Sequence, residues 1–141
     1  MERPLLVLLL LLACGCSTYR EGWGSRGRQV FLHETLPLQV RRATHRLDAE
    51  AGELVISWIG ARSPPGQPRI LACELVIFED RDGDGEPGAG EVVARREVRE
   101  ATTKVLFADL RVRLGEAPLV GRLAVETEAE RTLVRWLVAE D

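Results

Sequence analysis

A dense run of carboxylates in the middle of the chain has the residue types and spacing of a metal site. Aspartates recur at Asp80, Asp82 and Asp84, and Glu91 follows seven residues later. Calcium is a hard cation that takes about six to eight oxygen ligands. Alternate aspartates converge on one point when the chain curls tightly, and Gly85 permits such a turn. The spacing therefore predicts a loop that binds calcium.

The segment from Asp80 to Glu91 fits the pattern D-x-D-x-D-G-x5-E and resembles the calcium loop of EF-hand proteins. The resemblance implies that three aspartates give side-chain oxygens and that two glutamates complete the set. These residues are Asp80, Asp82 and Asp84, Glu86 through its backbone carbonyl, and Glu91 through both carboxylate oxygens.

The loop also departs from the EF-hand pattern. Pro87 stands at position 8 where EF-hands carry an aliphatic residue, and Gly88 at position 9 supplies no side chain. The flanking segments are predicted strands instead of helices. This combination resembles the loops at β-hairpins of exported bacterial sandwich proteins, where the ion stiffens the fold and does not signal. An acidic, glycine-rich turn without metal is the alternative interpretation.

No other group of residues has the spacing of a catalytic site. His33 and His45 are the two histidines, and neither has a cysteine or histidine nearby at zinc-ligand spacing. The serines lie in neither a G-x-S-x-G elbow nor an S-x-x-K motif. We therefore expect no enzyme activity. The alternative is a small hydrolase or carbohydrate-active domain of the cell envelope, which would need two carboxylates across a cleft.

The beginning of the chain has the layout of a bacterial signal peptide. Arg3 precedes an apolar run from Leu5 to Ala13, which is about half the ~20 residues that a membrane-spanning helix needs. The tetrapeptide LLAC, which ends at Cys14, resembles the lipobox of bacterial lipoproteins. The resemblance implies cleavage before Cys14 and lipid on its sulfur, with Cys16 as the alternative attachment site. An ordinary secretory signal peptide is the competing interpretation.

These features divide the chain into three predicted segments. Residues 1–13 form the signal peptide, residues 14–28 a lipidated flexible tether, and residues 29–141 a β-sandwich domain. The tether is rich in glycine, serine and charge, with almost no apolar periodicity. The remaining length suits a single hydrophobic core.

Apolar residues recur with period two through the domain, which predicts strands. The expected strands cover residues 36–41, 54–59, 70–79, 92–98, 103–114, 119–128 and 132–139. The segment 70–79 is the most apolar and is expected to be central, with 92–98 as its hairpin partner and Cys73 buried within it. The fold class is therefore all-β, an antiparallel β-sandwich of about seven to eight strands, either immunoglobulin-like or transthyretin-like.

Charge and composition narrow the classes of partner. The formal net charge is −3, from 19 Lys and Arg against 22 Asp and Glu, and there is no long basic run that would indicate nucleic-acid binding. We expect a lipoprotein of the cell envelope that is held to a membrane by its lipid anchor. Its domain would be a structural or binding module for envelope proteins or glycans, and an assembly or chaperone-like lipoprotein is a further hypothesis.

Overall fold

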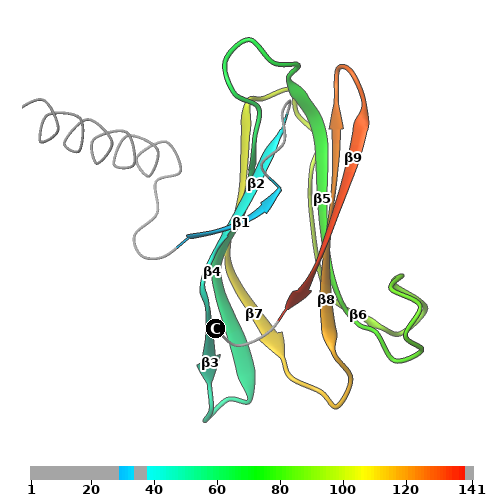
Figure 1. The fold of residues 1–141 in the computed structure, drawn as a ribbon. Helices are drawn as coiled ribbons and strands as arrows, with labels where there is room; N and C mark the ends of the chain where they lie inside the picture. The colour runs from blue at the N-terminus through cyan, green and yellow to red at the C-terminus, as the bar shows by residue number, and fades with distance from the viewer. Residues whose placement is uncertain (1–28, 34–37, 139–141) are drawn as a thin grey trace, which may run out of the picture.

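The computed structural model describes residues 29–33 and 38–138, and these residues form nine strands and no helix (Figure 1). The strands are β1 (Gln29–His33), β2 (Gln39–Ala43), β3 (His45–Asp48), β4 (Glu53–Arg62), β5 (Ile70–Glu79), β6 (Val92–Val98), β7 (Lys104–Arg113), β8 (Leu119–Thr127) and β9 (Arg131–Val138). The predicted signal peptide, both candidate lipid sites Cys14 and Cys16, and the tether lie outside the described residues. Within the described ranges, no helix has the length and apolarity needed to cross a membrane.

The strands form two antiparallel sheets that face each other as two layers (Figure 1). In the first sheet, β2 and β3 pair with the same side of β4 in one continuous register, so they are two halves of a single row that is interrupted at Thr44. β1 lies outside β2, and β7 pairs with the other side of β4. The second sheet has the order β6-β5-β8-β9.

This arrangement confirms the predicted all-β antiparallel sandwich. β5 pairs with β6 as predicted, and β5 lies inside its sheet between β6 and β8. The structure has nine strands where about seven to eight were expected, because the row beside β4 is divided and β1 pairs outside it. The choice between immunoglobulin-like and transthyretin-like topology stays a prediction.

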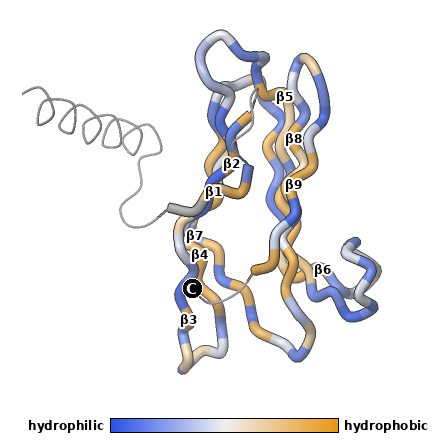
Figure 2. Tube along the Cα trace, in the orientation of Figure 1, coloured by the Kyte–Doolittle hydropathy of each residue, from blue (hydrophilic) through white to orange (hydrophobic). Residues whose placement is uncertain are grey.

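One apolar core fills the space between the two sheets, and apolar residues run along both layers (Figure 2). Leu75 and Ile77 of β5 are fully buried in it, and Leu75 lies in register with the equally buried Leu123 of β8. Cys73 is a free, buried residue of the same core, as predicted. Burial raises the pKa of its thiol to about 12, so this side chain stays neutral and packs as a small apolar residue.

The alternation of buried residues along β4 changes face in the middle of the strand. A strict period of two would place Leu54, Ile56 and Trp58 on one face, but Ile59 joins the main core and Trp58 packs with Ala43 in a separate cluster. The partner strand β7 explains this difference. Asp109 of β7 has a positive φ of 57°, and it lies between Leu110 and Ala108, which pair with Ile56 and Trp58. This left-handed residue lies at the point where the buried face changes in both strands.

Candidate metal centre

The acidic loop joins β5 to β6 and is fixed at its base by backbone hydrogen bonds. The N–H of Glu79 donates to the carbonyl of Glu91 at 2.9 Å, which closes the hairpin below the loop. The N–H of Asp80 donates to the carbonyl of Pro118 at 2.9 Å, which ties the start of the loop to the connection between β7 and β8. The loop therefore starts from a rigid base beside the end of β5.

The structure brings Asp80, Asp82 and Asp84 together in this loop. Each offers a carboxylate oxygen, and these atoms all lie within 4.8 Å of one another. Gly83 and Gly85 have positive φ values of 71° and 74°, which are left-handed conformations that glycine adopts without strain. They make the tight curl predicted from the spacing. The cluster of three aspartates could hold a metal ion.

The carboxylates of Asp82 and Asp84 affect each other's ionisation. The N–H of Asp84 lowers the pKa of Asp82, but the Asp84 side chain, partial desolvation and the charge of Glu91 together raise it above its usual range. The pKa of Asp84 is lowered by the N–H of Glu86 and by its side-chain hydrogen bond with Asp82. A raised pKa in one member of such a pair indicates crowded negative charge. A bound cation would relieve this crowding.

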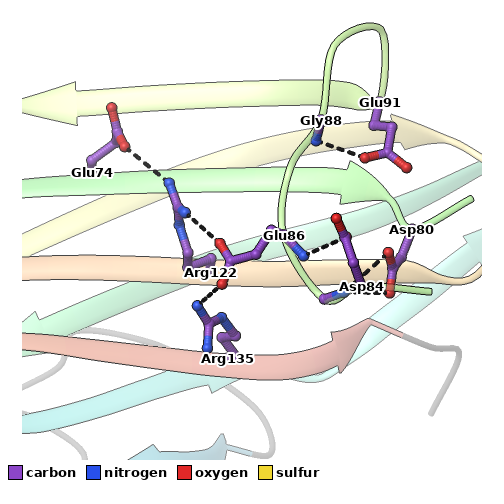
Figure 3. Close-up of polar contacts among 9 residues, drawn as sticks. Glu74, Asp80, Asp84, Glu86, Gly88, Glu91, Arg122 and Arg135 are labelled. Atoms are coloured by element: carbon purple, nitrogen blue, oxygen red, sulfur yellow. Dashed lines mark hydrogen bonds and ion pairs between the residues drawn. The ribbon is translucent and has the colours of Figure 1, made fainter. Parts of the chain in front are cut away.

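Backbone N–H groups already orient the three aspartates. The N–H of Gly85 donates to both carboxylate oxygens of Asp80, at 3.2 and 3.1 Å. Asp82 accepts from the N–H of Asp84 at 3.3 Å, and Asp84 accepts from the N–H of Glu86 at 2.9 Å. Figure 3 shows the Asp80 and Asp84 side chains held against the curl of the loop by such bonds. The loop thus keeps a defined shape through its own hydrogen bonds.

Glu91 is buried and binds the backbone of the loop. Its two carboxylate oxygens accept hydrogen bonds from the N–H of Gly88 at 2.6 Å and from the N–H of Arg81 at 2.9 Å. A Cβ on Gly88 would lie 2.7 Å from the nearer carboxylate oxygen, so a larger residue there would force the Glu91 side chain to shift. The cluster of aspartates does not include Glu91. The predicted bidentate ligation by Glu91 stays a prediction.

Glu86 directs its side chain out of the loop onto the second sheet. One carboxylate oxygen lies 3.3 Å from a guanidinium nitrogen of Arg122 in β8, and the other contacts Arg135 in β9 (Figure 3). Arg122 also lies 3.6 Å from Glu74 of β5, which in turn lies 3.4 Å from Arg95 of β6. The predicted ligand role of the Glu86 carbonyl stays a prediction, while the role of its side chain was not predicted.

A hollow with a volume of about 220 Å³ lies on the outer face of the same sheet. This is smaller than the roughly 300–1,000 Å³ typical of small-molecule sites. Among its lining residues, Glu74 pairs with Arg95 and Arg122, and Glu97 pairs with Arg99. Because these carboxylates are already paired with arginine, the acidic loop is the stronger candidate site.

No family model, curated protein or solved structure matches the chain. The candidate metal centre therefore depends on the geometry and chemistry of its own residues.

Proposed function

We propose that the chain is a membrane-anchored lipoprotein of the bacterial cell envelope whose β-sandwich is stabilised by calcium. In this proposal the domain is a structural or binding module and not a catalyst. The observation that carries the proposal is the convergence of Asp80, Asp82 and Asp84, with carboxylate oxygens within 4.8 Å of one another, at the end of a hairpin in the second sheet. The lipobox-like sequence before Cys14 supports the anchor.

The donor set favours calcium over other biological cations. All side-chain donors in the loop are carboxylate oxygens, which suit a hard cation. Magnesium needs a near-ideal octahedron, whereas calcium accepts larger and less regular oxygen shells, including those completed by water. Extracellular calcium modules bind at roughly 10⁻⁴ to 10⁻³ M, an affinity that suits an exported domain.

Charge explains how calcium would stabilise the sandwich. From Glu79 to Glu91 the chain carries six carboxylates, and Arg81 is the one cation within that segment. The loop joins β5 to its hairpin partner β6, so repulsion in the loop acts directly on that strand pair. A divalent ion bound by Asp80, Asp82 and Asp84 would offset this repulsion and connect the three carboxylates.

Calcium is expected to raise the melting temperature of the domain, and this measurement tests the proposal. At a free calcium concentration about a hundred times Kd, the gain is about 2.7 kcal/mol, which moves the midpoint of a domain of this size by roughly 10–20 °C. Melting curves recorded in calcium, in magnesium and in chelator provide the comparison. Equal midpoints in all three would show that the loop is an acidic turn without metal.

Two variants identify the loop as the source of the calcium effect. Asp84→Asn removes one charge from the cluster and should reduce the calcium-dependent increase in midpoint. Asp48→Asn makes the same change in the turn between β3 and β4, where Asp48 accepts a hydrogen bond from the N–H of Ala51. This control should melt at a different temperature but keep the full calcium increment.

Lipid on Cys14 is expected when the full chain is expressed in a bacterium that processes lipoproteins. Mass spectrometry of the mature amino terminus should find a diacylated cysteine at position 14, and Cys14→Ser should lose it. Cys16→Ser is the matched control and should keep the lipid. An unmodified terminus, or lipid on Cys16, would contradict this assignment.

A further inference from the structure

We infer that Glu86, Arg122 and Arg135 form a clamp that holds the acidic loop in its cation-binding shape before any ion binds. This inference rests on the calcium site proposed above and assigns a positioning role to three residues outside the aspartate cluster. We refer to these three side chains as the Glu86 clamp. Its members come from the loop, from β8 and from β9.

The clamp fixes the Glu86 side chain from two strands. Arg122 binds one oxygen of the carboxylate, and Arg135 binds the other (Figure 3). The backbone N–H of the same residue donates to Asp84 at 2.9 Å. Glu86 therefore contacts the outer face of the second sheet through its side chain and Asp84 through its backbone N–H.

Arg122 anchors the clamp to the sheet. Its side chain is 17% exposed, against 50% for Glu86 and 45% for Arg135, and it also faces Glu74. Isolated ion pairs between exposed side chains contribute little. Here one cation is largely buried and has a carboxylate on each side, so the clamp belongs to a network with a fixed centre.

The residues of β5 that face outward are buried, which agrees with a charged network that lies over this face of the sheet. Leu75 and Ile77 point into the core, so Val76 and Phe78 lie on the opposite face of the strand, yet both are also fully buried. Val76 lies in register with Arg95 on one side and Arg122 on the other. The charged network thus covers an apolar part of the outer face, which holds it close to the sheet.

A loop that is already ordered binds an ion more tightly than a flexible loop, because a smaller loss of conformational entropy accompanies binding. The effect of charge has the opposite sign. Removal of an arginine near a cation site lowers the local positive charge and should by itself strengthen calcium binding. Loss of the clamp should instead weaken it. The sign of the change therefore separates positioning from simple electrostatics.

The test compares Arg135→Gln with Arg131→Gln in the full domain by calcium titration. Both variants remove one arginine from the outer face of β9, but Arg131 lies at the far end of the strand, in register with Glu126. We expect Arg135→Gln to raise the calcium Kd on the order of tenfold, as partners that orient ligand residues do. Arg131→Gln should leave Kd nearly unchanged. Unchanged or tighter calcium binding in Arg135→Gln would overturn the inference.

Hydrogen exchange in chelator gives a second readout that needs no metal. The amides of Gly85 and Gly88 should exchange faster in Arg135→Gln and in Glu86→Gln than in wild type or Arg131→Gln, while core amides such as that of Leu75 keep their rates. Equal exchange of the loop amides in all four proteins would also overturn the inference. If wild type binds no calcium but the clamp variants exchange faster, the proposed calcium function fails while the clamp is supported.

Discussion

Glu91→Ala is expected to destabilise the domain by about 1–3 kcal/mol even when a chelator removes all calcium. The Glu91 carboxylate is buried and accepts hydrogen bonds from the N–H groups of Arg81 and Gly88. An unsatisfied buried donor costs roughly 1–3 kcal/mol. Alanine would leave the N–H of Gly88 without this partner, while the N–H of Arg81 also donates to the carbonyl of Glu79 at 3.0 Å. Urea unfolding in chelator measures the loss directly.

Glu91→Gln separates this structural role from ligation. One amide oxygen can still accept a hydrogen bond, but the amide nitrogen is a donor and cannot accept the second. In chelator, the glutamine variant should therefore fall between wild type and Glu91→Ala. In calcium, its deficit relative to wild type should increase, because the amide carries no charge for the ion. An alanine variant as stable as wild type in chelator would show that these hydrogen bonds do not support the loop.

The aspartate cluster could be predicted from the sequence because its geometry is local. Asp80, Asp82 and Asp84 are separated by single residues, and Gly83 and Gly85 supply the left-handed conformations that curl the chain. Neither feature depends on the remainder of the fold. The same locality explains the correct hairpin between β5 and β6, where two apolar segments flank one turn-forming loop.

The residues that support the cluster could not be predicted, because they depend on strand register. Arg122 and Arg135 lie 36 and 49 residues beyond Glu86 in the chain. They reach it only because β8 pairs with β5 and β9 pairs with β8 in particular registers. A shift by two residues would keep both arginines on the same face but move them along the strands away from Glu86. The apolar alternation indicates the face of each residue, but not the partner strand or the residue that lies opposite.

A single residue also decided where the predicted alternation changed. A strict period of two in β4 would place Trp58 with Ile56, but the buried face changes beside Asp109, which has a left-handed conformation in the neighbouring strand. Aspartate adopts this conformation more readily than most residues. An aspartate within an apolar segment is nevertheless not enough to predict a positive φ. Periodicity describes a regular strand, and this irregularity comes from the paired strand.

Leu75→Ala is expected to cause a loss of about 2–5 kcal/mol, the range for truncation of a buried leucine. Leu75 is fully buried in the middle of β5, in register with the fully buried Leu123, and belongs to the core between the sheets. Truncation of its isobutyl side chain to a methyl group leaves a cavity that strands paired on both sides of β5 cannot easily close. Thermal unfolding should show the loss, since each kcal/mol moves the midpoint by about 4–8 °C in a domain of about this size.

Leu133→Ala is the matched control for this core substitution. The substitution is again leucine to alanine in the same sheet, but the side chain of Leu133 in β9 is 46% exposed. Because less apolar surface is returned to water and no enclosed cavity forms, its loss should be well under half that of Leu75→Ala. Both variants should be measured in chelator so that the loop does not contribute. Equal losses in the two variants would mean that the inner face of β5 is no better packed than the outer face of β9, which would contradict a sandwich with its core between the sheets.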